Sequence, residues 1–521
     1  MNKLKRFFTH KTNLGRFVFI AVFIAMCFSF NLHNTLFGRP QSIHIWRQTN
    51  SLSIALNYYE HGNSLFEPQI HNQFCDDGMS GKSAGEFPII YFGVAKLWKV
   101  FGVHEWIFRF VLLLILFFGL FALFETCFYF LKNQFWSGFV SLILFTSPMV
   151  VFYGINFLPD GTSLVLMFIG WFFVLRYHQL RKTYWLWIGA FFFTLSLSIK
   201  ITSGISLIAF LAWIAFELIF RKKKDQILGY GIMQIMPYLV VIALTMAWYL
   251  YVVYYNNLHK GDYSEHTILP IWQMTSEKFS IIKDQVSKIF FKQYMNPYMQ
   301  YLTIILWIGL IARFRKNPFL LNWGLLLLPL GVFSILMLWF QVLHGHDYYL
   351  IVLLIAFAFI WMALFYALKN YKWMRHPLMY GLLIAIFAYN VYSCRKELKN
   401  RYEGWMNGWF VNNIEAVGEL DPLLNQLQIG KNDRVISIPD PSVVVSLYFM
   451  NRPGYTDFGS DFNQEEGFRK RIGQGAKYLI INDTTILSKP VVNAFAEHFM
   501  CKYRNVKIYD LRPYIIKTTK E

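Results

Sequence analysis

The chain has 521 residues, of which 56% are hydrophobic, 19% are aromatic and only 15% are charged, and its mean hydropathy is +0.37. Soluble domains average about 25% charged residues, so this composition excludes a soluble globular protein and indicates that most of the chain faces lipid. The formal net charge of +19 comes from short clusters between apolar runs, where cations orient membrane spans, so nucleic acid is not an expected partner.

Apolar runs recur along the chain and predict about eleven transmembrane helices, since a span needs about 20 apolar residues. The basic N-terminus and the first run have no small-residue cleavage site after them, so we expect a retained first helix. The predicted limits are 15–33, 107–131, 135–154, 161–180, 184–199, 202–220, 231–254, 299–313, 319–341, 348–368 and 376–393.

Basic residues lie in alternate loops between these spans, which is the pattern of loops that face the cytoplasm. They are Lys132, Arg176–Lys182, Arg221–Lys224, Arg313–Lys316 and Lys369–Arg375. With the basic N-terminus also in the cytoplasm, the remaining connections and the tail are predicted to lie outside. These are the loop 44–87, the turn 156–160, the loop 255–297, the turn 344–349 and the tail from about 395.

The first outer loop, 34–106, contains a polar stretch rich in aromatic residues from His44 to Phe87. Loops longer than about 12 to 15 residues are usually functional or disordered, and the aromatic content argues against disorder. An amphipathic helix is expected from Asn50 to His61, and EFPIIYFGVAKLWKVFGV is expected to form an interfacial helix that is too short and too charged to cross. These helices either form the working face of an enzyme or only close the top of the bundle.

The tail, 395–521, differs in its sequence pattern from the membrane part, 1–394. DRVISIPD, AKYLIIND and VKIYDLRP predict short strands, and PSVVVSLYFM and EEGFRKRIG predict helices between them. Such alternation is typical of a small α/β domain with a parallel sheet. We expect this domain to support the membrane part or to recognise an acceptor.

Three charged residues stand beside apolar runs, where an ionisable side chain is a functional candidate. Lys200, on the predicted outer side, either binds an anionic lipid head group or only reaches to the interface. Asp160 follows a proline at the start of a span, where an acid is also an ordinary cap. Arg109 opens the second span on the outer side, and the same argument applies to it more weakly.

The turn HGHDYY at 344–349 places His344, His346 and Asp347 at an outer helix end, either as metal ligands or as hydrogen-bonded residues of the lip. A divalent metal is therefore left open, and no other cofactor is expected. The first outer loop adds both acids and cations: His44, Arg47, Glu60, His61, Glu67, His71, Asp76, Asp77, Lys82 and Glu86. A carboxylate that takes a proton from a hydroxyl, with cations that hold a phosphate leaving group, needs such a mixture.

The serial order of several segments between about residues 40 and 350 resembles a known family. The segments are WRQT, SIALNYYEHGN, EPQI, EFPIIYFGVAKLWKVFGVHEWIFR, INFLPDG, LSIKITSG and HDYY. They look like the bacterial glycosyltransferases related to protein O-mannosyltransferases and aminoarabinose transferases. The resemblance implies GT-C architecture and transfer of a sugar from a polyprenyl-phosphate carrier to an acceptor outside the cytoplasmic membrane, with inversion at the anomeric carbon.

The family's presumed base is an acid in the first outer loop, and here the signs are exchanged. Where the family commonly has Asp-Glu near the start of the first-loop helix, this chain has Arg47 and Gln48. Where the family often has Lys before Pro-Pro, this chain has Glu86. We therefore expect Arg47 and Glu86 to face one another, with Glu86, or failing it Asp77, as the base and Arg47 as a ligand of the phosphate.

Two further positions match the family directly. Asp160 matches the family's acid after the third span, and Lys200 matches its lysine near the fifth span. The catalytic candidates are Glu86, Asp77 and Asp160. The candidates for donor binding are Arg47, His44, Lys200, Arg109, His346 and Tyr348.

The predicted fold class is an α-helical polytopic membrane protein of GT-C architecture, in the bacterial cytoplasmic membrane, with a small extracytoplasmic α/β domain. Its expected partners are a polyprenyl-phosphate sugar donor, an extracytoplasmic lipid, glycan or protein acceptor, and the bilayer. Two alternatives remain open. A transporter or flippase of polyprenyl-linked sugar or polysaccharide would be expected to carry internal repeats, which the sequence lacks. A non-catalytic membrane scaffold would explain why the family's acid is missing.

Overall fold

The computed structural model describes residues 11–261, 268–403, 408 and 410–518. The chain divides into two compact units. The first comprises Met1–Phe37, Arg109–Tyr249 and His266–Leu398, and the second comprises Gly38–Phe108, Leu250–Glu265 and Lys399–Glu521. The first outer loop and the tail therefore belong to the same unit. The domain boundary at residue 394 stays a prediction.

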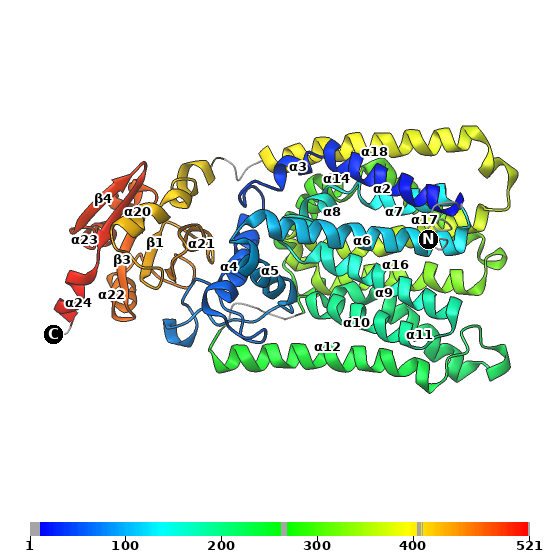
Figure 1. Ribbon diagram of the computed structural model, residues 1–521, viewed down its shortest axis with the longest axis horizontal. Helices are drawn as coiled ribbons and strands as arrows, with labels where there is room; N and C mark the ends of the chain where they lie inside the picture. The colour runs from blue at the N-terminus through cyan, green and yellow to red at the C-terminus, as the bar shows by residue number, and fades with distance from the viewer. Residues whose placement is uncertain (1–10, 262–267, 404–407, 409, 519–521) are drawn as a thin grey trace, which may run out of the picture. The chain divides into compact units, whose positions relative to one another are not determined.

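Long apolar helices make up most of the first unit, where several run side by side (Figure 1). Within the described residues, seven are long and apolar enough to cross a membrane, or eight if the pair Ser276–Tyr294 and Pro297–Ala312, bent by 91°, is one span. The seven are Glu105–Leu131 (α6), Asp160–Leu180 (α9), Ile201–Phe220 (η2 and α11), Ile232–Leu258 (α12), Phe319–Leu343 (α16 and η7), Asp347–Leu368 (η8 and α17) and Pro377–Glu403 (α18). A polytopic helical membrane protein is thus confirmed.

Shorter helices complete this unit. They are α2 (Lys11–Ser29), α3 (Leu32–Thr35), α7 (Gln134–Leu144), α8 (Pro148–Tyr153), α10 (Tyr184–Ile199), α13 (Ser276–Gln285), α14 (Phe291–Tyr294) and α15 (Pro297–Ala312). Each predicted span coincides with helix, but the span predicted at 135–154 is divided into α7 and α8. The division falls where Ser147 caps a new helix that begins at Pro148, because proline has no N–H for the preceding helical ladder. The number of spans, about eleven, stays a prediction.

Close helix packing fixes α9, the helix that begins with Asp160. A Cβ at Gly119 of α6 would lie 2.2 Å from the Cβ of Val165 on α9. A Cβ at Gly170 of α9 would lie 2.3 Å from the ring of Phe193 on α10. Glycine at these points lets neighbouring backbones approach, as is common between membrane helices. The glycines therefore hold α9 between α6 and α10.

The first outer loop, in the second unit, contains α4 (Ile45–His61), η1 (Asp76–Gly78) and α5 (Ile89–Phe101). The helix expected at the interface is found as α5, and its position at the interface stays a prediction. Helix α4 begins five residues before the predicted start at Asn50 and is not simply amphipathic. Its polar residues from Gln48 to Ser51 are buried as well. Nearby carbonyls satisfy part of this polar set: Gln48 donates to Ile43 O and Thr49 donates to Ile45 O. Apolar periodicity alone could not show this.

The tail folds on a sheet of β1 (Arg434–Ile438), β2 (Gly454–Tyr455), β3 (Ala476–Ile481), β4 (Phe499–Tyr503) and β5 (Val506–Asp510), in the order β2-β1-β3-β5-β4. Strand β1 is parallel to β2 and β3, but β5 is antiparallel to both β3 and β4. The prediction of a parallel sheet is therefore wrong for the half that contains β5 and β4. Only Arg504 and Asn505 connect β4 to β5, and so short a connection permits only an antiparallel pair.

The tail also contains the helices α20 (Asp421–Gln426), α21 (Val445–Met450), α22 (Glu465–Gly473), α23 (Pro490–Ala494) and α24 (Arg512–Thr518). Of these, α22, α23 and α24 contribute residues to a small core that they share with the sheet. Ile436, Phe468, Leu479 and Tyr509 belong to one buried apolar cluster. The sequence thus predicted the α/β character of the tail correctly.

The first outer loop is hydrogen-bonded to the edge of this sheet. The backbone N–H of Gly454 on β2 donates to His71 O at 3.0 Å, and Gln73 N–H donates to Gly454 O at 2.8 Å. The buried His71 ring also bonds to Ser53 on α4 at 2.7 Å and to Asn451, just after α21, at 3.1 Å. Segments almost 400 residues apart in the chain are therefore held together around α4.

Candidate functional site

Arg47 and Glu86 form an ion pair inside the first outer loop. Arg47 lies in the first turn of α4 and Glu86 just before α5, and Arg47 Nη2 lies 2.5 Å from Glu86 Oε1. Their side chains are 21% and 16% exposed. The contact between α4 and α5 thus brings together the two positions at which the signs of charge are exchanged.

Two hydroxyl groups extend this pair into what we call the first-loop cluster: Arg47, Ser51, Glu86 and Tyr91. Tyr91 of α5, which is 1% exposed, donates to Glu86 Oε1 at 2.5 Å, and Ser51 of α4 donates to the Tyr91 oxygen at 3.3 Å. Burial opposes ionisation of Glu86, but the charge of Arg47 and the hydrogen bonds from Tyr91 and Arg47 outweigh it and lower the pKa of Glu86 to about 2. Glu86 is therefore an anion at neutral pH.

The other acidic candidate of the loop, Asp77, lies at the surface. Its side chain is 74% exposed and pairs with Lys260 at 2.5 Å. The neighbouring Asp76 instead lies 3.0 Å from His259 Nδ1 and accepts a hydrogen bond from Ser80 at 2.5 Å. Both aspartates thus connect η1 to the end of α12. Neither belongs to the first-loop cluster.

Asp160 and Lys200 form the second ion pair, in the first unit. Asp160 opens α9 and Lys200 ends α10, and Lys200 Nζ lies 2.8 Å from Asp160 Oδ1. The side chains of Asp160 and Lys200 are 2% and 18% exposed, so the carboxylate is shielded and the lysine is partly exposed. Packing of α9 against α10 therefore joins two candidates that the sequence presented separately.

Aromatic residues of the HGHDYY turn surround this pair, and we call Asp160, Lys200, Tyr348 and Tyr349 the bundle cluster. Lys200 Nζ lies 3.5 Å from the centre of the Tyr349 ring and 5.5 Å from that of Tyr348. A ring face at this distance stabilises a cation without neutralising it. Lys200 thus lies between the Asp160 carboxylate and two tyrosine rings.

The adjacent residues of the turn support this arrangement. Asp347 is fully buried and accepts a hydrogen bond from Tyr153 of α8. The exposed His346 lies with its Nδ1 3.1 Å from the hydroxyl oxygen of Tyr348. Asp347 therefore fixes the turn, and His346 orients Tyr348. Within the described residues, no group of three or more His, Cys, Asp or Glu side chains could hold a metal ion.

The two remaining candidates lie outside both clusters. Arg109 is 1% exposed, donates to Thr35 O, and has its guanidinium carbon 4.5 Å above the Phe157 ring. His44 is the residue before α4 and has a left-handed backbone with φ of 57°. Arg109 thus ties α6 to α3 and to the turn before α9. His44 sets the start of the helix that carries Arg47.

The sequence did not single out Tyr91, Tyr153, Ser51 or Tyr349. Tyr91 lies in a helix predicted only to rest at the interface, where a tyrosine is ordinary. Tyr349 belongs to the HDYY motif, so its position beside Tyr348 was the one available signal. Each cluster places a shielded carboxylate beside a cation and a tyrosine. Such a set can hold an anion and accept a proton.

Comparison with known proteins identifies the fold. No family model and no curated protein matches the sequence. The crystal structure of ArnT from Cupriavidus metallidurans in the apo state is similar with a TM-score of 0.59 and 13% identity, over 97% of this chain and 99% of that one. The structure of the same protein bound to undecaprenyl phosphate is similar with a TM-score of 0.57 and 12% identity, over 96% of this chain and 98% of that one.

Arabinofuranosyltransferase AftD from Mycobacteria matches less closely, with a TM-score of 0.46 and 12% identity over 95% of this chain and 39% of its own. The predicted GT-C fold is confirmed by the likeness to ArnT, which extends through the membrane helices and the α/β domain.

Proposed function

We propose that the protein is an inverting glycosyltransferase of the membrane, which moves a sugar from a polyprenyl-phosphate carrier to an extracytoplasmic acceptor. The observation that carries the proposal is the Arg47–Glu86 ion pair with Tyr91, which keeps a carboxylate ionised beside a cation. The fold shared with ArnT supports it, because one ArnT structure contains undecaprenyl phosphate.

The first step is binding of the carrier phosphate by cations. In this proposal Arg47, in the second unit, and Lys200, in the first, are each a candidate ligand of the phosphate oxygens. Such a cation stabilises the negative charge that develops as the bond from the anomeric carbon to the phosphate oxygen breaks. Lys200 pairs with Asp160 at 2.8 Å, so in this proposal a phosphate would join an existing ion pair. Polyprenyl phosphate is then the leaving group.

The second step is attack by the acceptor hydroxyl. Glu86 takes the hydroxyl proton while the oxygen forms a bond to the anomeric carbon from the face opposite the phosphate, which inverts that centre. The pKa of about 2 makes Glu86 a weak base while Arg47 is paired with it. When Arg47 turns to the phosphate, Glu86 loses its main stabilising charge and becomes more basic. Donor binding therefore activates the base.

The proposal also includes the orientation of the chain in the membrane. The basic loops face the cytoplasm of a bacterial cell, and the first outer loop, the HGHDYY turn and the α/β domain lie outside. Under this arrangement a polyprenyl carrier presents its sugar on the side where the acceptor is found. Cysteine labelling from outside intact cells tests it: Ser488→Cys in the tail should be labelled, and Lys223→Cys should not.

The experiment that tests the activity uses purified protein in vesicles loaded with a polyprenyl-phosphate sugar and a mixture of candidate acceptors. Release of polyprenyl phosphate with formation of a glycosylated acceptor supports the proposal. Movement of the intact carrier between leaflets without release supports the transporter alternative and overturns it. Absence of both, with Glu86→Gln indistinguishable from the wild type, supports the scaffold alternative.

A further inference from the structure

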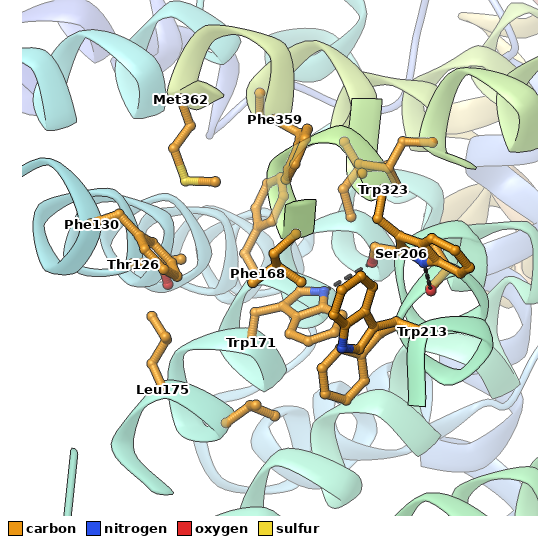
Figure 2. Close-up of a pocket in the computed structure, with 18 of the residues that line it drawn as sticks. Thr126, Phe130, Phe168, Trp171, Leu175, Ser206, Trp213, Trp323, Phe359 and Met362 are labelled. Carbon is orange, nitrogen blue, oxygen red and sulfur yellow. Dashed lines mark hydrogen bonds between the residues drawn. The ribbon is translucent and has the colours of Figure 1, made fainter. Parts of the chain in front are cut away.

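An apolar cavity of about 380 Å³ lies within the first unit, among α6, α9, α11, α16 and α17. Figure 2 shows its wall of aromatic side chains, with Phe168 and Trp171 from α9, Trp213 from α11, Trp323 from α16 and Phe359 from α17. Ligand pockets have volumes of about 300 to 1,000 Å³, so this one suits a single hydrocarbon chain or a compact apolar group. Neither of the two charged clusters contributes a residue to its lining.

Two polar atoms of the lining have no hydrogen-bond partner within the described chain. They are Nε1 of Trp213, a residue that is 0% exposed, and Oγ1 of Thr126 on α6. The other indole groups are satisfied: Trp171 donates to Ser206 at 2.9 Å and Trp323 donates to Ala209 O at 3.0 Å. A buried N–H without an acceptor is costly. An occupant with one or two carbonyl oxygens would satisfy Trp213.

One end of the cavity carries cations. Its lining includes Ile227 and Leu228, which follow the run Arg221 to Lys224, and His178, which precedes Arg181 and Lys182. The guanidinium carbon of Arg221 lies 5.7 Å from the Trp213 ring. Lys222, Lys223 and Lys224 are exposed. This end thus offers several cations next to an apolar interior.

Glu217 lies at the same end of the cavity, but its single negative charge does not balance the cations there. Its carboxylate accepts from the backbone N–H groups of Ile227 at 2.7 Å and Leu228 at 3.0 Å and lies 3.8 Å from Arg221. It therefore shapes the loop that closes the cavity. In the sequence, the lysines that follow Arg221 are followed by one exposed acid, Asp225. A negatively charged group is favoured at this end.

We propose that this cavity binds one acyl chain of an anionic phospholipid from the leaflet on the side of the basic loops. The phosphate lies against Arg221 and the lysines that follow it, the ester carbonyl accepts a hydrogen bond from Trp213 Nε1, and the acyl chain fills the space between Phe168 and Phe359. The site is separate from the proposed transfer reaction and does not depend on it. Charge complementarity selects this occupant over a neutral lipid, and the lack of charged groups inside excludes a sugar or a free phosphate.

Native mass spectrometry of the delipidated full chain tests the proposal on the unmodified protein. Phosphatidylglycerol and phosphatidylcholine with identical acyl chains are titrated in parallel. We expect a phosphatidylglycerol adduct at a concentration at least fivefold lower than the phosphatidylcholine adduct. Equal binding of the two lipids would overturn the proposal. Displacement of phosphatidylglycerol by equimolar undecaprenyl phosphate would also overturn it, and would assign the cavity to a polyprenyl chain instead.

Matched variants locate the site. Ala358→Phe, on α17 in the lining, should abolish the adduct, while Leu326→Phe, on the exposed face of α16, should retain it. Changing Lys222, Lys223 and Lys224 to Gln should lower the binding of phosphatidylglycerol to the level of phosphatidylcholine binding. The pair Arg315→Gln and Lys316→Gln in another basic loop should not. An adduct unaffected by Ala358→Phe would contradict the location. If that variant does not fold, Ala209→Leu on α11 replaces it.

Discussion

The two charged clusters each pair a shielded carboxylate with a cation, but they support opposite members of the pair. In the first-loop cluster the additional partner, Tyr91, donates to the acid Glu86. In the bundle cluster the additional partner, the ring of Tyr349, lies against the cation Lys200. The acid is 16% exposed in the first and 2% exposed in the second.

This difference indicates which cation is able to leave. Removing one partner of a buried pair leaves an uncompensated charge, which is strongly unfavourable. Glu86 would keep the hydrogen bond from Tyr91 if Arg47 turned to a phosphate, whereas Asp160 is almost fully buried beside Lys200. We infer that Arg47 moves away from Glu86 during the reaction, whereas Lys200 stays beside Asp160. Four predictions test this contrast, from the largest effect to the smallest.

The largest effect is expected for Glu86→Gln, which removes the base but keeps the shape. Loss of a general base costs about 10²- to 10⁴-fold, so we expect the rate of polyprenyl phosphate release to fall by about 10³-fold. The matched control is Asp77→Asn, an exposed acid of the same loop, which should change the rate by less than about twofold. If Asp77→Asn abolished release and Glu86→Gln did not, the base would be Asp77.

The second prediction concerns Lys200→Gln, which should lower kcat by about 10²-fold, the usual effect of removing one group that stabilises the developing charge. Lys200→Arg should keep part of the activity because the charge remains. Lys182→Gln, an exposed lysine elsewhere, is the control. A loss in Lys200→Gln that is confined to KM would mean that Lys200 binds the donor without assisting the chemistry, which contradicts the proposed role.

The third prediction uses pH. In the free wild-type protein, Glu86 has a pKa of about 2 and is ionised above about pH 4, so kcat/KM should show no acid limb in that range. Arg47→Met removes the main cause of that depression and leaves burial, which raises the pKa, opposed by the hydrogen bonds from Tyr91 and the backbone. The pKa of Glu86 should therefore rise, and kcat/KM should fall at a higher pH than in the wild type as the pH decreases, on top of an overall loss of about tenfold.

A flat profile in Arg47→Met would contradict this third prediction, since it would mean that Glu86 is not coupled to Arg47. Tyr91→Phe should shift the pKa in the same direction by a smaller amount, because it removes one hydrogen bond and no charge.

The smallest effect is on stability, and it concerns the unit of the first-loop cluster alone. A Cβ at Gly454 would lie 1.9 Å from Val435 O, so Gly454→Ala must shift β2 and the segment at His71 that bonds to it. Overpacking costs about 1 to 3 kcal/mol, which should lower the Tm measured by nano-calorimetry by several degrees. Gly473→Ala, where a Cβ meets nothing within 4 Å, is the control. Equal Tm values for the two variants would contradict the described pairing.

The sequence predicted the membrane helices well because apolar length is a strong local signal. It predicted the presence but not the burial of α4. The polar residues from Gln48 to Ser51 break the apolar period, and the sequence does not show that nearby carbonyls accept hydrogen bonds from Gln48 and Thr49. The antiparallel β4–β5 pair was missed because β4 is half-exposed and lacks a clear apolar pattern. Local patterns of this kind do not report which strands become neighbours.

The candidate residues show the same limit. Comparison of motifs led to Arg47 and Glu86 as facing charges, and the structure places them 2.5 Å apart. Their functional roles stay predictions. The sequence did not indicate that Asp160 and Lys200 pair with each other, nor that Tyr91 and Tyr349 complete the clusters. These contacts depend on how α9 packs on α10 and α4 on α5, which no single motif encodes.

The most direct test of the central claim is a double-mutant cycle on the rate of polyprenyl phosphate release in single turnover, with Glu86→Gln, Arg47→Met and both together. Residues that act in one reaction step are strongly non-additive, whereas independent effects multiply. If Arg47 and Glu86 act together on the sugar-phosphate bond, the double variant should be slowed little more than Glu86→Gln alone. A loss equal to the product of the two single losses would contradict the account.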